Sequence, residues 1–376
     1  MKTNIPERIA ALREAMRQQK VDAYIIPSSD PHLSEYPADR WKSREWISGF
    51  TGSAGTIVVT ADKAGLWTDS RYFLQAASQL EGSGIELYKL ALPETPSITE
   101  FLLHELHTGQ AVGLDGQTYS AAEASALANK LSRKEIKLDT SADLIEGIWK
   151  DRPAVPGNPI FEMPEALSGA SVHEKLDLIN NQLRSEGADC LILAALDEIA
   201  WTFNIRGTDV TYNPVVVSYA FVSEDESVLF IKPEKLTAEI TEHLKKEGVT
   251  LAEYSMIQRY LSRLPENSRV FVDMNKTNVS LYDAIPGSCT IVEGISPANH
   301  LKSTKNETEI KGFQNAVVKD GVALTKFYIW LEKQMAEGAQ VTEISAAEKL
   351  TALRAEQPQY IMDSFGTICG YAEHGA

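Results

Sequence analysis

The chain has 376 residues, which is long enough for two domains of ordinary size with a remainder. Its 52 acidic and 36 basic residues leave a net charge of −16 at pH 7, which argues against nucleic acids and anionic membranes as partners. No apolar run approaches the roughly 20 residues of a membrane span, and the first residues lack a secretion signal. Three widely spaced cysteines (Cys190, Cys289 and Cys369) suit a reducing compartment, so we expect a cytoplasmic protein.

Local patterns in the first 150 residues predict an α/β domain. Apolar side chains at helical spacing over residues 5–16 lead into a short buried strand, Ala23–Ile26. A second helix is expected over residues 42–50. Two strands that pair with each other are expected over Thr56–Thr60 and Ala64–Thr68.

The second block of the chain repeats this order of elements. Residues 188–193 match residues 21–26, and residues 201–207 match residues 46–52. The change in spacing between the two matches places about twelve extra residues near 31–42 in the first copy, so the period is that of a duplicated domain. A proline-rich stretch at 149–159 blocks regular structure and predicts a linker between domains at 1–150 and 160–298.

A third domain is expected to begin near residue 300. One long helix is predicted over residues 306–335, another over 345–356, and a strand over 364–370. The 76 residues after His300 are too few to cover the apolar side chains of the long helix. Either the first two domains or additional sequence must therefore shield it, and without that shield we expect self-association or loose order after about residue 300.

Two short motifs resemble known binding sites, but their spacing or the secondary structure around them does not fit such sites. Gly49, Gly52 and Gly55 are spaced like a phosphate-binding loop, yet they precede a strand instead of a helix, which favours tight turns. His104 and His107 are three residues apart, whereas two helical zinc ligands are four apart. The histidines are therefore better explained by a solvated helix face.

The inserted loop concentrates polar side chains between Asp30 and Tyr36. Inserted loops on rigid scaffolds often carry function, so this one could contact a peptide or a neighbouring subunit. A loop capped by its own Asp and Ser side chains is an equally good interpretation.

The cysteines show no catalytic pattern. Cys190 and Cys369 lie in apolar or strand contexts and lack a companion histidine and acid at recognisable spacing. We expect both to be buried.

Arg71 is the strongest single candidate for a binding residue. Asp69 is expected to cap a helix over residues 70–80, which places Arg71 in a first turn, where a cation opposes the helix dipole. Either an ion pair with Asp69 or Asp39 favours it there, or its guanidinium is presented to a carbonyl or carboxylate of a ligand. No arginine recurs at the equivalent place in the second copy, residues 229–235, so the fold does not require one.

Five long motifs resemble the three-domain, cytosolic form of aminopeptidase P, also called X-prolyl aminopeptidase, and the likeness extends over essentially the whole chain. The motifs lie at residues 23–36, 48–56, 67–73, 197–207 and 341–347. The resemblance implies two related creatinase/prolidase N-terminal-type α/β domains in tandem. At residues 300–376 it implies the incomplete start of a pita-bread α+β catalytic domain.

The resemblance also implies an activity, the removal of an N-terminal residue when proline follows. In the family a dinuclear manganese site supplies a hydroxide and polarises the scissile carbonyl. The family places its metal ligands and its substrate-binding histidine after the segment that matches this chain's last residues, and His374 occupies a different place. We therefore expect no catalytic residue and no metal ligand here. Only Arg71 carries over, with an implied role in binding substrate.

The expected partners are peptides with proline in second position and a second copy of the chain, as a homodimer. The chain by itself is not expected to hydrolyse peptides. Two other interpretations stay open: a creatinase-type relative that acts on a small C–N substrate, and a non-enzymatic interaction or oligomerisation module made of the duplicated domains.

Overall fold

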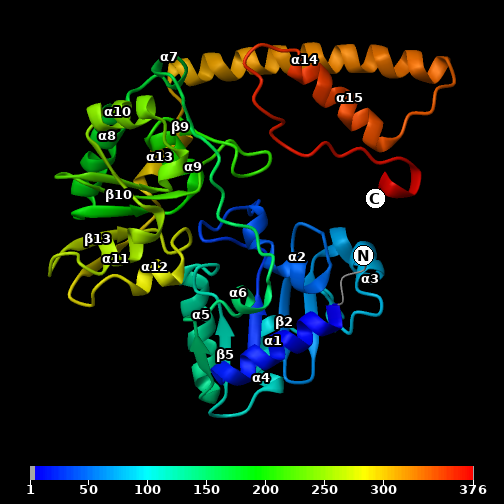
Figure 1. Ribbon diagram of the computed structural model, residues 1–376, viewed down its shortest axis with the longest axis vertical. Helices are drawn as coiled ribbons and strands as arrows, with labels where there is room; N and C mark the ends of the chain where they lie inside the picture. The colour runs from blue at the N-terminus through cyan, green and yellow to red at the C-terminus, as the bar shows by residue number, and fades with distance from the viewer. Residues whose placement is uncertain (1–4, 376) are drawn as a thin grey trace.

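The computed structural model of this protein describes residues 5–375. Two α/β domains and a C-terminal helical segment follow one another along the chain (Figure 1). Residues 1–4 and Ala376, which the expected domains at 1–150 and 300–376 include, lie outside the described residues. Within the described range, no helix combines the length and the apolar composition needed to cross a membrane.

The first domain is built on a six-stranded mixed sheet in the order β4-β3-β2-β1-β5-β6. β1, β2 and β3 pair antiparallel, and the other neighbours pair in parallel. The strands are β1 (Ala23–Ile26), β2 (Thr56–Thr60), β3 (Ala64–Thr68), β4 (Glu86–Lys89), β5 (Ala111–Leu114) and β6 (Lys137–Asp139). The α-helices are α1 (Ile5–Gln19), α2 (Ser43–Ser48), α3 (Phe73–Gln79), α4 (Ile98–Glu105), α5 (Ala121–Leu131) and α6 (Leu144–Ile148).

The central strand of this sheet is buried on both faces. Successive side chains of a strand point to opposite faces, so Tyr24 and Ile26 join the core under α1 and α6, whereas Ala23 and Ile25 join the core under α4 and α5. A strand covered on both sides reads as a continuous apolar run, which explains why the sequence pattern gave its bounds correctly. The two predicted partner strands are also confirmed, with the same bounds.

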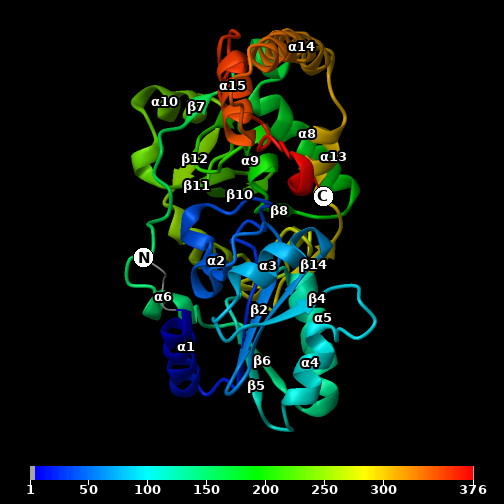
Figure 2. The ribbon, with the colours of Figure 1, turned by 90° about the vertical axis from the view of Figure 1, so that its right-hand side faces the viewer.

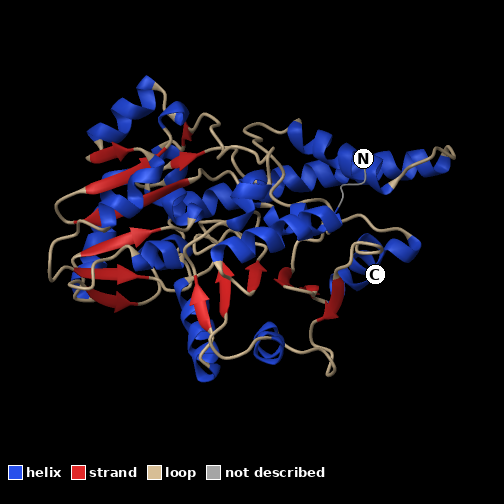
Figure 3. Cartoon of the chain, turned by 60° about the horizontal axis from the view of Figure 1, so that its bottom comes forward, coloured by secondary structure: helices blue, strands red, loops and turns tan. Residues whose placement is uncertain are grey.

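The second domain repeats the first, with the sheet order β12-β11-β10-β8-β13-β14, and Figure 3 shows the two sheets as separate groups of strands. Its strands are β8 (Cys190–Leu193), β10 (Ser218–Ser223), β11 (Ser227–Ile231), β12 (Val249–Ala252), β13 (Arg269–Val272) and β14 (Thr290–Glu293), and β7 (Phe161–Glu162) and β9 (Ile205–Arg206) form a separate pair. Its helices are α7 (Glu165–Ser168), α8 (Val172–Ser185), α9 (Leu196–Thr202), α10 (Ala238–Lys246), α11 (Ile257–Leu261), α12 (Val279–Asp283) and α13 (Pro297–Ser303). The predicted duplication is confirmed.

The predicted insertion in the first copy is confirmed as well. Residues 27–42 separate β1 from α2, whereas only residues 194–195 separate β8 from α9. The insertion contains one short 3₁₀ turn, Asp39–Trp41, directly before α2. Most of the extra chain is therefore available to reach across to the second domain.

The C-terminal segment begins with a long helix, α14 (Glu307–Ala336), and turns back through α15 (Glu343–Ala355). Asn306 caps α14 in a reciprocal pair with Glu309. In Figure 1, α14 starts beside α7 and runs far past the second domain, with α15 beneath it, and Figure 2 views it nearly end-on. Only Ala323 of this helix is buried, so the first two domains do not shield it.

The strand predicted over residues 364–370 is wrong. Apart from a 3₁₀ turn at Ala372–Gly375, the chain after α15 forms only turns and irregular structure. A strand needs a neighbouring strand for its backbone hydrogen bonds, and within residues 5–375 none lies alongside this stretch.

Candidate functional site

Arg71 lies where β3 ends and a 3₁₀ turn, Ser70–Tyr72, begins. Asp69 caps this turn and accepts a hydrogen bond from the Arg71 backbone N–H. The guanidinium also donates from Nε and Nη2 to the two Asp69 carboxylate oxygens, each at 2.8 Å. These hydrogen bonds raise the pKa of Arg71 and lower the pKa of Asp69. Of the two expected partners, Asp69 is therefore the one that Arg71 pairs with, since Asp39 pairs with Lys42.

The ion pair leaves Arg71 accessible. Its side chain is 64% exposed, and its guanidinium lies 5.0 Å from the centre of the Tyr72 ring. Nη1 has no hydrogen-bond partner among the residues that the structure describes. Asp69 thus fixes one edge of the guanidinium and leaves the other free for a ligand.

A pocket of about 250 Å³ lies between the inserted loop, the glycine turn and the second domain, and Arg71 itself does not line it. Tyr72 is connected to this pocket, because its hydroxyl is 2.6 Å from that of Ser53, which lines it. Other lining residues are Glu35, Tyr36, Arg44, Glu45 and Tyr212. The Arg44 guanidinium already donates to Ser28, Phe50 and Gly52. The pocket therefore offers carboxylates and phenols, which can hold a polar ligand such as a peptide backbone.

Three aromatic rings from distant parts of the chain meet at this pocket. Tyr36 of the inserted loop packs edge-on against Tyr212 of the second domain, with ring centres 6.2 Å apart. It packs in the same way against Phe365 of the C-terminal segment, at 6.4 Å. The inserted loop, the second domain and the C-terminal segment thus meet around Tyr36.

The first half of the inserted loop is structural. The buried Asp30 carboxylate accepts the backbone N–H groups of His32 and Ser34, as the capping interpretation requires. His32 is buried against the second domain, where its Nδ1 donates to the Ala194 carbonyl at 2.9 Å and its Nε2 accepts from the Tyr254 hydroxyl at 3.0 Å. Burial lowers the pKa of His32 to about 3, so the ring is neutral and joins the two domains.

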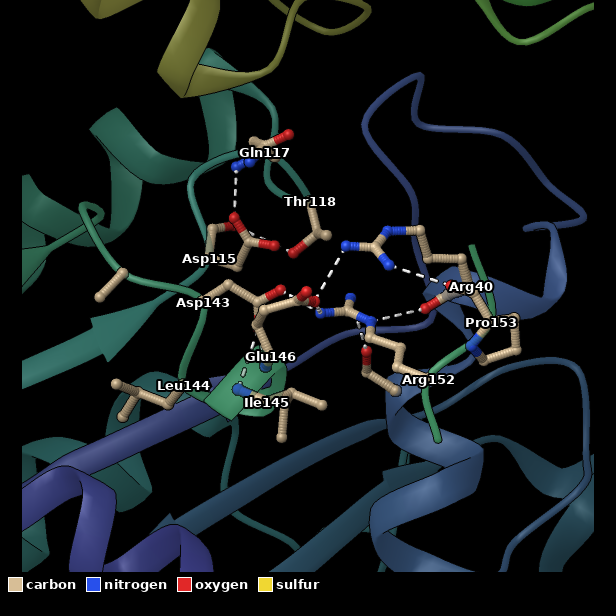
Figure 4. Close-up of polar contacts among 12 residues, drawn as sticks. Arg40, Asp115, Gln117, Thr118, Asp143, Leu144, Ile145, Glu146, Arg152 and Pro153 are labelled. Atoms are coloured by element: carbon tan, nitrogen blue, oxygen red, sulfur yellow. Dashed lines mark hydrogen bonds and ion pairs between the residues drawn. The ribbon is translucent and has the colours of Figure 1, made fainter. Parts of the chain in front are cut away.

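A second joint fixes the linker between the domains (Figure 4). Arg152 of the linker has a side chain only 4% exposed, and it pairs with Asp143 and Glu146 at α6 and donates to the Arg40 carbonyl at 3.0 Å. Arg40, in the inserted loop, donates back to the Pro153 carbonyl at 3.0 Å and to Glu146 at 2.9 Å. The loop and the linker therefore hold each other in place.

Asp115 lies beside this joint, where Figure 4 shows its carboxylate accepting the backbone N–H of Gln117. Burial, reinforced by the negative charge of Asp143, raises the pKa of Asp115 to about 7. The cluster therefore carries less negative charge at neutral pH than its carboxylates alone indicate.

The glycine motif is a set of tight turns, as expected. Gly49 ends α2 in a left-handed conformation, with φ of +72°. At Gly52 a Cβ atom would lie 2.3 Å from the Phe50 ring, so no side chain fits there. The buried Arg44 holds the turn by donating to the carbonyls of Phe50 and Gly52, each at 2.6 Å.

Both histidines of the pair, His104 and His107, are exposed to solvent. The His104 ring hydrogen-bonds Glu105 at 2.8 Å, and His107 lies exposed on the surface. Nowhere in residues 5–375 do three or more His, Cys, Asp or Glu side chains come together so as to hold a metal ion.

One of the two cysteines expected to be buried is not. Cys190 is buried, and its burial raises the pKa of its thiol to about 12, so it is inert. Cys369 is exposed, contrary to expectation. The strand that was expected to bury it does not form.

Models of the creatinase/prolidase N-terminal domain match the chain twice, at residues 8–148 and 151–309. Together with the repeated sheet order, these matches define the class: the chain carries two creatinase/prolidase N-terminal domains in tandem.

The chain is a homologue of aminopeptidase P. It is 38% identical to the probable Xaa-Pro aminopeptidase P of Laccaria bicolor over 99% of this chain and 59% of that protein. It is 36% identical to aminopeptidase P2 of Arabidopsis thaliana over 100% of this chain and 58% of that protein. The crystal structure of X-prolyl aminopeptidase from Caenorhabditis elegans, described as a cytosolic enzyme with a di-nuclear active site, matches with a TM-score of 0.91 and 30% identity, over 97% of this chain and 62% of that one. The chain thus spans about three fifths of the length of these relatives.

Proposed function

We propose that this chain forms the N-terminal part of a metal-dependent aminopeptidase that releases the first residue of peptides with proline in second position. The support is the identity to Xaa-Pro aminopeptidases along nearly the whole chain, together with the TM-score of 0.91 to the Caenorhabditis elegans enzyme. On the same likeness we propose a cytoplasmic location, a homodimer and domain bounds of 1–150, 160–298 and 300–376. In this proposal α14 and α15 begin a pita-bread catalytic domain.

The described residues do not fit the metal site of such an enzyme, because they contain no group of side chains able to hold a metal ion. Two divalent ions, manganese in this proposal, would activate a water molecule and polarise the scissile carbonyl. Other residues would have to hold those ions. We therefore assign this chain a role in binding and positioning the substrate.

Arg71 is the residue that we propose for substrate binding. Its bidentate bond to Asp69 fixes the guanidinium in one orientation, and an orientation that is already fixed lowers the entropy lost on binding. The free Nη1 could then donate to a carbonyl or carboxylate of the peptide. Tyr36, Tyr212 and Phe365 supply apolar surface nearby for peptide side chains.

The test is a manganese-supplemented peptidase assay on this chain alone and on this chain followed by the C-terminal segment of the Caenorhabditis elegans enzyme. Arg-Pro-Pro is the substrate, and Arg-Ala-Pro is the control that lacks proline in second position. We expect release of arginine from Arg-Pro-Pro by the longer protein only. A folded, metal-loaded longer protein without activity would contradict the proposal, and activity of the chain alone would show that the catalytic site has been misplaced.

Self-association is a second candidate function, and the exposed apolar side chains of α14 favour it. Phe313 and Val317 are 59% and 71% exposed, and Val318 and Ile329 of the same helix are exposed as well. Burying such a surface between two copies would stabilise a dimer. Sedimentation velocity of the wild-type chain and of Val317→Asp tests this, since a dimer that the substitution dissociates supports it and a wild-type monomer at micromolar concentration contradicts it.

A further inference from the structure

A pocket of about 410 Å³ lies between the second domain and the first turns of α14, and Arg71 is not among its lining residues. Figure 1 shows the start of α14 next to α7, at one end of this domain. The pocket is lined by Trp201 and Arg206 of the motif 197–207, which the proposed peptidase function leaves without a role. Its volume is in the range of sites for small ligands.

Arg206 brings unused hydrogen-bond donors to this pocket. Its Nη1 donates to the carbonyls of Ala200 and Ile205, at 2.6 and 2.9 Å, and these bonds fix the guanidinium. Among the described residues, Nε and Nη2 have no partner, and no carboxylate forms an ion pair with Arg206. An arginine stays charged in proteins, so a fixed cation with free donors lines the cavity.

The charges around the pocket are unbalanced in the positive direction. Lys175 is buried and donates to the Trp201 carbonyl at 2.9 Å, with its ammonium 4.7 Å from the centre of the Trp201 ring. Burial lowers its pKa to about 8, so most of it is still charged at neutral pH. In the part of the chain that the structure describes, neither Lys175 nor Lys305 forms an ion pair.

Two carboxylates line the pocket, and one of them forms an ion pair. Asp197 pairs with Lys302, and Glu309 accepts hydrogen bonds from the indole of Trp201 at 3.3 Å and from the backbone of Asn306 at 3.0 Å. The negative charge of Glu309 also acts on Lys175 and Arg206. Four cations nevertheless line the pocket with only two carboxylates, in a chain whose net charge is −16. A ligand that is an anion would correct this local excess.

The walls of the pocket are largely apolar, with Leu167, Trp201, Pro214, Val215 and Phe313 among them. Gly312 of α14 also lines it, and a Cβ atom there would meet nothing within 4 Å. The space beside Gly312 is therefore open to the apolar part of a ligand.

We propose that this pocket binds an organic anion, a carboxylate on an apolar or aromatic body, with the carboxylate on the free donors of Arg206 and the body against Trp201. A charge-assisted hydrogen bond to a fixed guanidinium is stronger than a neutral one, and a partly buried site screens it less than open solvent does. The site is separate from Arg71 and does not depend on peptidase activity.

Isothermal titration calorimetry on the chain tests this, with 4-phenylbutyrate as the probe and its uncharged amide, 4-phenylbutyramide, as the comparison. We expect the carboxylate to bind at least about tenfold more tightly than the amide. Gly312→Leu should abolish binding, because the new side chain fills the open space without a clash. Gly321→Leu is the matched control, since Gly321 lies on the same helix with equally open surroundings but does not line the pocket.

Lys305→Gln is a second variant, whose exposed position makes a folding defect unexpected. It should weaken binding of the carboxylate severalfold and leave the amide unaffected. Equal affinity for carboxylate and amide, equal effects of the two glycine substitutions, or no heat of binding at millimolar 4-phenylbutyrate would each overturn the proposal.

Discussion

Lys232 forms an ion pair with Glu234, at 2.5 Å, in the place of the second domain where Asp69 and Arg71 pair in the first. The strand registers align the two ion pairs. Leu66 is paired with Ile57 across β2 and β3, and Leu229 is paired with Ala220 across β10 and β11. The charges are exchanged, so Glu234 occupies the position of Arg71. Both copies of the fold thus carry opposite charges two residues apart here, and only the first carries an arginine.

This alignment makes Glu234 the matched control for the proposed substrate contact. In the peptidase formed with the C-terminal segment of the relative, Arg71→Ala should lower kcat/KM for Arg-Pro-Pro by roughly tenfold to a hundredfold, the loss expected for one charge-assisted hydrogen bond. Glu234→Ala should leave kcat/KM unchanged. If both variants retain full activity, Arg71 does not bind substrate.

Breaking a buried ion pair in the second domain should lower the unfolding free energy more than breaking an exposed one. Lys235 pairs with Asp209, and both side chains are almost wholly removed from solvent. Lys235→Met leaves the Asp209 charge buried without its partner, which costs about 3–5 kcal/mol of unfolding free energy. Urea denaturation measures this, and Lys232→Met, which breaks the more exposed pair nearby, should cost about 1 kcal/mol or less. Equal losses in the two variants would contradict the assigned burial.

The joint at His32 predicts a loss of stability in acid. The folded state holds the pKa of His32 at about 3, below its ordinary value of 6.5. Between these two pH values the unfolded chain therefore binds a proton at His32 that the folded chain does not bind. The contribution of His32 is complete above about pH 6.5 and is lost as the pH falls towards 3, at up to about 1.4 kcal/mol per pH unit.

This prediction requires unfolding free energies from urea titrations at several pH values between 4 and 8. His32→Gln should make the pH dependence less steep than in the wild type, whereas substitution of the exposed His173 by Gln should leave it unchanged. A wild-type slope that survives in His32→Gln would mean that other groups cause it.

The glycine turn predicts a steric penalty. Gly52→Ala would bring its Cβ within 2.3 Å of the buried Phe50 ring and 2.7 Å of Tyr72, and relief of such overpacking typically costs about 1–3 kcal/mol. Gly147→Ala in α6 meets nothing within 4 Å and should be neutral or stabilising. Thermal unfolding of both variants would show the difference, and an unchanged melting temperature in Gly52→Ala would refute the close approach.

Sequence patterns predicted the elements that depend on local information. β1, β2 and β3 lie within their expected bounds, and the helix expected over residues 306–335 became α14, because capping and periodicity are properties of neighbouring residues. The strand expected over residues 364–370 failed, because a strand also needs a partner, which no local pattern reveals.

The candidate site was visible in the sequence only in part. Arg71 and its partner Asp69 are two residues apart, so their relation could be anticipated. The three rings that meet near the pocket come from distant segments, so no sequence spacing predicts their contact; they are Tyr36, Tyr212 and Phe365. The free donors of Arg206 were equally hidden, since a motif shows which residue is present but not which of its hydrogen bonds are made.

The hairpin of α14 and α15 fixes the position of the chain that follows it. At 1.5 Å per residue its 30-residue first helix extends about 45 Å, and ion pairs from Arg354 to Asp320 and from Lys326 to Glu356, each at 2.7 Å, set how far the chain returns along it. The position of Phe365 against Tyr36 is therefore set by the length of α14 up to these ion pairs. Removing one helical turn of α14 before Asp320 would shift the returning chain by about 5.4 Å relative to the second domain, enough to separate the two rings.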